Sequence, residues 1–322
     1  MLKLNTLSGF GSGVSGGGAA AATYGYFIAG QSTGGAYSLA ADRITYSTGV
    51  AAAHADANAS VAREGPKGLS DTITYGYAMG GWSTEARSGM TDRITFSTST
   101  TAASTDSNLS TDRYIGGTTS DSVTYGYYCG GNQSSGGAGK KVTGDRIVFS
   151  TSITSAHTDA DLSEARQSPG TTSSATYGYI CGGWAAAAVD TGGRITFSTG
   201  VTAAHTDADL SSARGGASGL TDGTAYGYLM GGYSNAAAAT TDRITFSTSV
   251  LAAHTDSDLP SADNNAASHS DNSVYGYYAS ASTSAIEGQR MTFSTGVVAV
   301  HTDSDTSEPK NNTAGISDGS PS

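Results

Sequence analysis

Two short patterns recur along the chain, and each has the alternation of hydrophobic and polar residues typical of a β-strand. In segment 242–247 (DRITFS), Ile and Phe alternate with Arg and Thr, a period of two carried by β-branched and aromatic residues. In segment 226–232 (YGYLMGG), two Tyr and a Met fall on one face, and the Gly pair marks the end of the strand. No stretch has the 3.6-residue period of a capped amphipathic helix. The pattern therefore predicts an all-β protein built from short strands.

Both patterns belong to a repeat that occurs six times. The Tyr-Gly-Tyr anchor begins at residues 24, 75, 125, 177, 226 and 275. The DRITF-like anchor begins at Asp42, Asp92, Asp145, Gly193, Asp242 and Gln289. A bland segment of small residues, such as 215–224, precedes the next Tyr-Gly-Tyr and suits a strand at a crowded axis. Repeats of about 50 residues with four short strands match the blades of a β-propeller. We therefore expect a six-bladed β-propeller of four-stranded antiparallel blades.

The ends of the chain suggest how the ring closes. We divide the sequence into a Gly-rich N-terminal extension or first inner strand (1–22), six blades (23–308), and a C-terminal closing strand and tail (309–322). Segment 311–320 (NNTAGISDGS) aligns with the inner-strand segment 215–224 (GGASGLTDGT). It is predicted to supply the inner strand of blade one, which leaves the ring without a free edge. Segment 8–22 competes for the same place, so both closures stay open here, with the tail favoured.

The repeat resembles the kelch repeat over about residues 8–320. The residues that carry this resemblance are Gly231 and Gly232 after the strand with Tyr226 and Tyr228, and an Arg expected at the end of the fourth strand, as at Arg63, Arg166 and Arg214. Two departures are that Ser-Thr stands where kelch repeats usually carry a Trp, and that blade six has Ser280-Ala281 in place of Gly-Gly. The strings YGYxxGG and DRITFST also resemble short-repeat propellers of bacteriophage virion proteins. These resemblances imply a propeller with a structural or attachment role.

Length variation is concentrated in one loop of the repeat. The Asp position of the DRITF-like anchor and the His position that follows it are 12 residues apart in all six copies, whereas Tyr-Gly-Tyr and the DRITF-like anchor are separated by 14 to 20. The variable loop joins strands two and three and carries Trp82, Asn132, Trp184 and Tyr233 at matching places. Because loops presented by a rigid scaffold often carry function, we predict a binding face made of these loops. The alternative is drift in unconstrained loops.

The residues capable of chemistry mostly belong to the repeat, which favours structural roles. Five of the six His share one position, and Cys129 and Cys181 share another, so we expect packing residues and buried free thiols. The Arg of the DRITF-like anchor is expected to stack on Tyr or to bridge blades, with a ring of anion-binding Arg residues as the alternative. The D-x-D pairs are Asp159/Asp161, Asp207/Asp209, Asp256/Asp258 and Asp303/Asp305. They are expected to form turns by bonding their own backbone, with calcium binding as the alternative. The sequence thus predicts no enzyme, no catalytic residues and no cofactor or metal beyond that calcium alternative.

Charge and hydropathy narrow the partners. The formal net charge is −11 and the sequence pI is about 4.8, so the surface repels nucleic-acid phosphates and anionic membranes. No run reaches the ~18 apolar residues that span a bilayer, and the first residues lack the apolar core of a signal peptide. We expect neither nucleic-acid binding nor membrane insertion, and synthesis in a cytoplasm without a signal peptide.

These observations favour a non-enzymatic structural or attachment protein of an assembled particle. The expected setting is a phage or virus virion, or another extracellular particle, with the propeller as a decoration, fibre or receptor-facing module. Its partners would be other structural proteins of the same particle and a glycan or protein of the host surface. The alternative function is a bacterial surface or secreted propeller that binds carbohydrate or protein.

Overall fold

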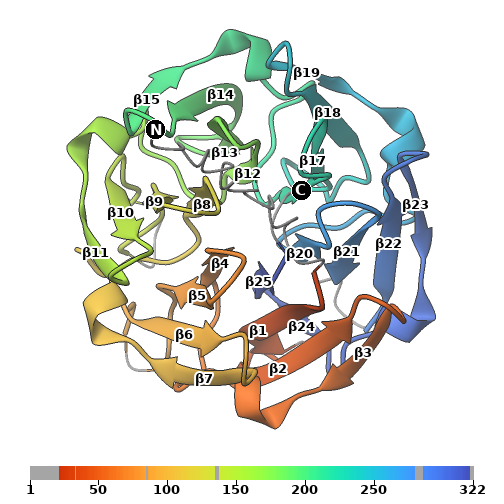
Figure 1. The fold of residues 1–322 in the computed structure, drawn as a ribbon. Helices are drawn as coiled ribbons and strands as arrows, with labels where there is room; N and C mark the ends of the chain where they lie inside the picture. Colours follow the sequence, from red (N-terminus) through yellow and green to blue (C-terminus); the bar gives the residue numbers. More distant parts are fainter. Residues whose placement is uncertain (1–21, 33, 85, 135–137, 280–285, 320–322) are drawn as a thin grey trace, which may run out of the picture.

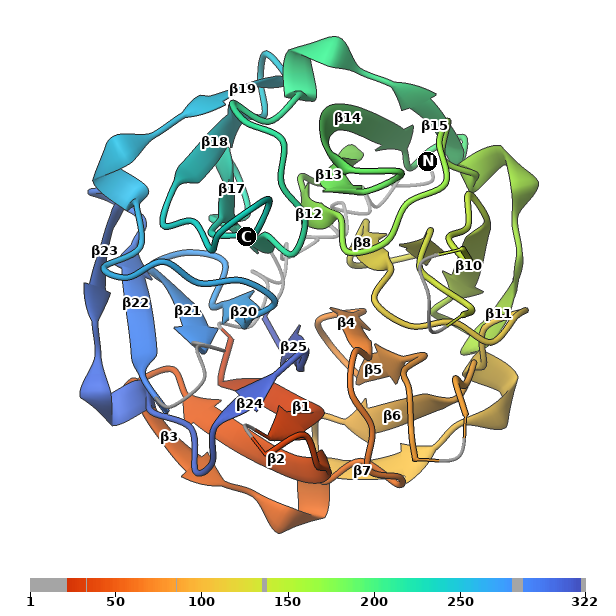
Figure 2. The ribbon, with the colours of Figure 1, turned by 180° about the vertical axis from the view of Figure 1, so that it is seen from behind.

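The computed structural model describes residues 22–32, 34–84, 86–134, 138–279 and 286–319. Six antiparallel sheets follow one another around a central axis in sequence order (Figures 1 and 2). Five of them have four strands, and the sheet of blade one has a fifth, because two short C-terminal strands, β24 (Lys310–Asn311) and β25 (Ala314–Ser317), both pair with β1 (Tyr24–Ser32). Each sheet begins with a short inner strand at the axis and ends with an outer strand at the rim. This arrangement confirms the predicted six-bladed propeller.

The strands of each blade follow the repeat. Blade two contains β4 (Lys67–Ser70), β5 (Tyr75–Met79), β6 (Thr91–Thr95) and β7 (Thr100–Ala103). Blade three contains β8 (Gly117–Ser120), β9 (Tyr125–Cys129), β10 (Gly144–Val148) and β11 (Ile153–Ala156). Blade four contains β12 (Gly170–Ser173), β13 (Tyr177–Trp184), β14 (Ala188–Thr196) and β15 (Val201–Ala204). Blade five contains β16 (Ser218–Thr221), β17 (Tyr226–Met230), β18 (Thr241–Thr245) and β19 (Val250–Ala253). Blade six contains β20 (Ala267–Ser270), β21 (Tyr275–Ala279), β22 (Gly288–Thr292) and β23 (Val297–Val300).

Blade one joins the two ends of the chain in a single sheet. It contains β1 (Tyr24–Ser32), β2 (Tyr37–Thr45), β3 (Val50–Ala53), β24 (Lys310–Asn311) and β25 (Ala314–Ser317). Strand β25 pairs with β1 along its whole length, and β24 pairs with the end of the same strand. The predicted closure by the C-terminal strand is therefore confirmed. Residues 1–21, which include most of the competing segment 8–22, lie outside the described residues.

Aromatic rings stack between every pair of neighbouring blades. The second Tyr of each Tyr-Gly-Tyr lies against the aromatic residue of the DRITF-like strand in the next blade, with centroids 5.6 to 6.2 Å apart. The pairs are Tyr26–Phe96, Tyr77–Phe149, Tyr127–Phe197, Tyr179–Phe246, Tyr228–Phe293 and Tyr277–Tyr46. Offset stacking of this kind stabilises by about 0.5–1.5 kcal/mol beyond the buried area. The stacks thus link all six blades into a closed ring.

The Gly of Tyr-Gly-Tyr lets the blades approach each other. A Cβ at Gly178 would lie 2.2 Å from Oγ1 of Thr119, which belongs to the inner strand of the preceding blade. A Cβ at Gly126 would lie 2.9 Å from Leu69 in the same relation. Real Cβ atoms do not tolerate such distances, so this position accepts only glycine while the neighbouring inner strand stays in place.

The first Tyr of the anchor packs within its own blade. The guanidinium carbon of each DRITF-like Arg lies 4.2 to 4.6 Å from the centroid of that Tyr ring. The pairs are Arg43–Tyr24, Arg93–Tyr75, Arg146–Tyr125, Arg194–Tyr177, Arg243–Tyr226 and Arg290–Tyr275. The predicted stacking of this Arg on Tyr is confirmed in all six blades.

Buried ion pairs fix the connections between blades. The expectation that Arg63, Arg166 and Arg214 end the fourth strand is wrong, because that strand stops at Ala53 in blade one and each Arg lies in the connection that follows. In blades two, three and five this Arg instead reaches the Asp of the DRITF-like anchor in the blade it leads into. In blade four, where Gly193 replaces the Asp, Arg166 donates to the carbonyls of Gly182 and Thr191. The pairs are Arg63–Asp92, Arg113–Asp145 and Arg214–Asp242, at 2.6 to 2.7 Å, and Lys310–Asp42, at 3.0 Å.

Glycine 178 provides a test of the blade contact. We expect Gly178→Ala to lower the free energy of unfolding by about 1–3 kcal/mol, the usual cost of overpacking. Adding Thr119→Ala removes the two nearest atoms that a Cβ would strike and leaves Cγ2 of Ile195, at 2.8 Å, in place, so it should recover part of the loss. Urea denaturation of the single and double variants measures both. Gly34→Ala, where a Cβ would meet nothing within 4 Å, is the control and should be nearly neutral.

The buried ion pair of blade two gives a second test. Asp92→Asn keeps the shape of the side chain but leaves the buried guanidinium of Arg63 without its counter-charge. Breaking a buried pair in this way costs about 3–5 kcal/mol, which should lower the urea midpoint markedly. Asp56→Asn, at an exposed Asp of a 3-10 turn, is the control. Equal small effects of the two variants would contradict a stabilising role for this pair.

Candidate functional site

The variable loops and the connections between blades form one face of the propeller, called here the loop face. In four blades, the residue directly after the Gly-Gly pair forms an isolated β-bridge with the connection that enters the same blade. These bridges are Trp82–Glu64, Asn132–Tyr114, Trp184–Gln167 and Tyr233–Gly215. The antiparallel topology places the turns between strands one and two, and between strands three and four, on the opposite face. The four predicted residues therefore occupy equivalent places on the loop face.

Three aromatic rings meet on the loop face where blades one, two and three adjoin. Trp82 lies 5.5 Å from Tyr114 and 6.4 Å from Tyr37, measured between ring centroids. The guanidinium carbon of Arg87 lies 4.3 Å from the centroid of Trp82 and 5.4 Å from that of Tyr114. We call Tyr37, Trp82, Arg87 and Tyr114, with the adjoining Glu64, the aromatic cluster. All but the buried Glu64 are half-buried residues, and Nε and Nη2 of Arg87 are themselves buried.

Charges within the aromatic cluster are partly desolvated. Burial raises the pKa of the Glu64 carboxyl, while its hydrogen bond with Asn312 and the nearby Arg87 oppose the rise. Burial, and then the negative charge of Glu64, raise the pKa of Tyr114. Aromatic residues and Arg are the side chains enriched in the energetically dominant centres of protein contacts. The composition of the cluster is thus that of a contact site. Among the described residues, such a cluster lies at a single blade junction.

The other predicted residues differ in what they present. Trp184 is half-buried and lies 5.9 Å from the ring of Tyr233, which is 40% exposed. Asn132 is 1% exposed, and its amide donates to Oε1 of Gln167 at 2.6 Å. Its side chain therefore ties two blades together and does not reach the surface. Three of the four predicted residues, Trp82, Trp184 and Tyr233, present rings on the loop face.

Sequence reasoning missed most of the aromatic cluster. Tyr114 and Glu64 occupy the place directly after the connection Arg, where Gln167 and Gly215 stand in other copies. Comparison of that place across the repeats would have marked Tyr114 as unusual. Tyr37 and Arg87 lie in loops of different length and sequence, so no repeat alignment brings them together.

The repeated His and Asp residues serve the framework. His254 bonds Oγ of Ser257 through Nδ1 at 2.8 Å and Arg243 through Nε2 at 2.7 Å. The second residue of each D-x-D or D-x-N pair accepts from the backbone N–H of the residue directly before the DRITF-like anchor, at 2.7 to 2.8 Å. These acceptors are Asn58, Asn108, Asp161, Asp209, Asp258 and Asp305. The pairs do lie at 3-10 turns, but the expectation that they bond their own backbone is wrong, because the acceptor side chain binds an N–H group 17 residues earlier in the chain. Within the described ranges, no three His, Cys, Asp or Glu side chains are grouped so that they could hold a metal ion.

Comparison with known proteins identifies no family for this chain. No protein-family model matches this sequence, and no curated protein shows significant similarity to it. Among the helical turns of the described residues, none has the length and apolar character needed to cross a lipid bilayer. The class defined by the structure is a six-bladed β-propeller with a repeated framework and a loop face that departs from the repeat.

The two cysteines allow a direct test of their predicted burial. Both are free and buried, and burial raises the pKa of each thiol to about 12, against about 8.5 for an exposed thiol. At pH 8 we expect neither Cys129 nor Cys181 to react with a thiol-specific disulfide reagent in the native chain. Both should react in guanidinium chloride, which is the control. Fast reaction of either thiol under native conditions would contradict the packing described here.

Proposed function

We propose that this chain is a non-enzymatic structural or attachment protein of an assembled particle, and that its loop face contacts the partner. The observation that carries the proposal is a division within each repeat. Stacked rings and glycine contacts recur in all six blades. The loops of the loop face differ in length and sequence, and among the described residues the aromatic cluster lies at one junction. A framework kept regular beneath one irregular face is typical of a scaffold that presents a contact surface.

The kind of particle is proposed from two short sequence strings that recur in the repeat. The strings YGYxxGG and DRITFST resemble kelch-like, short-repeat propellers of bacteriophage virions. The proposed setting is therefore a virion or other extracellular particle, with its other structural proteins as first partners and a host surface glycan or protein as a further one. The net charge of −11 supports a partner that is not nucleic acid.

The aromatic cluster favours a second candidate function. Trp82 and Tyr114 offer partly exposed apolar ring faces beside the guanidinium of Arg87. Amphipathic rings of this kind suit ligands with both an apolar face and hydroxyl groups. The second candidate is a bacterial surface or secreted propeller that binds carbohydrate or protein at this cluster.

Two variants of the chain separate the loop face from the opposite face. Trp82→Ala with Trp184→Ala removes two rings of the loop face. Ile73→Ala with Val123→Ala is the matched control, because both residues are highly exposed and lie in turns between strands one and two, on the opposite face. We expect the Trp variant to co-sediment at least tenfold more weakly with purified particles, since hot-spot rings contribute about 2 kcal/mol or more each. The control should bind as the parent chain does.

Mass spectrometry and a glycan array decide between the two candidate functions. The particle proposal requires peptides of this chain in gradient-purified particles from its source, at a constant ratio to the other structural proteins. Their absence there, together with saturable glycan binding that depends on Trp82, would replace the particle proposal with the second candidate. Unchanged binding of the Trp82/Trp184 variant in both assays would remove the loop face as the contact surface.

A further inference from the structure

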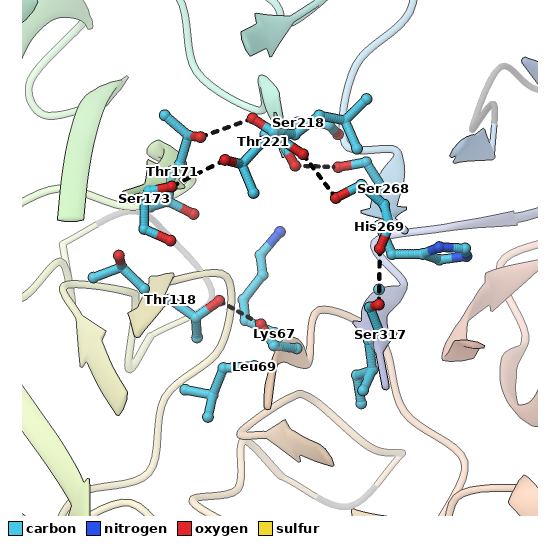
Figure 3. Close-up of a pocket in the computed structure, with 18 of the residues that line it drawn as sticks. Lys67, Leu69, Thr118, Thr171, Ser173, Ser218, Thr221, Ser268, His269 and Ser317 are labelled. Carbon is cyan, nitrogen blue, oxygen red and sulfur yellow. Dashed lines mark hydrogen bonds between the residues drawn. The ribbon is translucent and has the colours of Figure 1, made fainter. Parts of the chain in front are cut away.

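The inner strands of the six blades surround a cavity on the propeller axis (Figure 3). The cavity volume is about 190 Å³, and its lining comes from β4, β8, β12, β16, β20 and β25. Nearly all lining residues are Ser, Thr, Gly and small apolar residues. The cavity is thus a polar space bounded mainly by hydroxyl groups.

Most of these hydroxyl groups are already committed as donors. The hydroxyl of Thr118 donates to the carbonyl of Gly68 at 2.7 Å, that of Ser268 to Gly219 at 2.7 Å, and that of Ser317 to Ser270 at 2.8 Å. Each bond joins the inner strands of two neighbouring blades, as the dashed lines in Figure 3 show. The hydroxyl ring therefore stabilises the cavity wall and offers few free donors to a ligand.

One lysine interrupts this uniform lining. Lys67 opens β4, and its side chain points into the cavity (Figure 3). The matching inner-strand positions hold Gly117, Gly170, Ser218, Ala267 and Ala314. A side chain with four methylene groups and a charge thus replaces a small residue in one blade of six. Sequence comparison of the inner strands would have found this departure.

The ammonium group of Lys67 has no counter-charge around it. No acidic residue lines the cavity, and the described structure gives Lys67 no ion pair. The other ionisable lining residue is His269, whose ring is buried and lies 2.9 Å through Nδ1 from the Tyr46 hydroxyl. Burial lowers the pKa of His269 to about 3, so this ring stays neutral. Within the part of the chain that the structure describes, Lys67 is then the sole charged group at the cavity wall.

An isolated ammonium in such a place is energetically unfavourable. Surrounding protein lowers the pKa of Lys67 to about 8 by desolvation, although the side chain keeps some contact with water. Desolvated charges in proteins are normally paired or hydrogen-bonded. At pH 7 the amine is still mostly protonated, and an anion beside it would offset the desolvation cost.

We propose that the axial cavity is a binding site for a small oxyanion, a phosphate, sulfate or carboxylate group, held by the ammonium of Lys67. The proposal stands apart from the function assigned to the loop face. A water molecule occupies about 30 Å³ in the liquid, so a cavity of about 190 Å³ admits a small oxyanion with several waters. Lysine is a compact point charge with three donors, which suits one negatively charged group. With a single cation and few free hydroxyl donors, the expected affinity is in the millimolar range.

Phosphate titration of the intact chain tests the site. The chain has five Lys, at residues 3, 67, 140, 141 and 310, so the NMR signals of the side-chain CεH₂ groups can be assigned with single variants. Phosphate at constant ionic strength should shift the Lys67 signal with saturation at pH 7. In Lys67→Ala the saturable binding should weaken at least tenfold. This variant should fold, because other copies of the repeat hold Ala at this position.

Lys140→Ala is the matched control, since Lys140 lies in the variable loop of blade three, outside the cavity lining. It should bind phosphate as the parent chain does. Sulfate and acetate should compete for the Lys67 signal, which would establish the oxyanion class. The proposal is overturned if phosphate, sulfate and acetate all leave the Lys67 signal unshifted up to about 50 mM, or if Lys67→Ala binds as tightly as the parent. Neither result depends on particle or glycan binding, so the loop-face proposal is tested separately.

Discussion

The close contact between the inner strand of one blade and the Gly of Tyr-Gly-Tyr in the next is the constraint on which this ring depends. Glycine has no Cβ, and a Cβ at this position would collide with the inner strand of the preceding blade. Without it, the two sheets lie close enough for the Tyr to stack on the aromatic residue of the following blade. Because the contact recurs at every junction, its geometry sets the angle between blades. Six equal angles bring β25 and β1 together, so the closure of the ring follows from a local packing rule.

The junction that closes the ring differs from the other five in a way that specifies its register. Tyr46 stands where the other blades carry Phe, and its hydroxyl lies 2.9 Å from Nδ1 of His269 and donates to the carbonyl of Ser270 at 3.0 Å. Both side chains are buried. A buried phenol and imidazole need hydrogen-bond partners, and a shifted junction would leave them without these. The aromatic stacking is alike at every junction, and the Tyr46–His269 hydrogen bond distinguishes the junction between blades six and one.

Repetition made the fold predictable from the sequence, and the same repetition limited what could be predicted of the site. Strand order, blade number and closure by the tail followed from anchors that recur at nearly constant spacing. The pairing of Arg63 with Asp92 did not, because it joins two anchors that belong to different copies. The aromatic cluster was harder to predict for a related reason: Tyr37 and Arg87 come from loops that no repeat alignment brings together, although Tyr114 occupies a repeat position where it is unusual. The burial of Asn132 depends on Gln167 of the neighbouring connection, which spacing alone does not reveal.

A repeat protein also carries its own internal standard for unusual residues. At the ion-pair position of blade four, Gly193 replaces the Asp, and Arg166 donates instead to the backbone carbonyls of Gly182 and Thr191. In blade six, Asp263 and Gln289 stand where blades two, three and five have Arg and Asp, so both members differ together and no unpaired cation is buried there. That coupled change is what selection for stability produces. Lys67 is the opposite case, because no neighbouring acid accompanies the change from a small residue to a cation. Among the described residues no partner compensates for this destabilising group, which supports the proposal of a partner from outside the chain. Sites of function are where local rules of stability are broken.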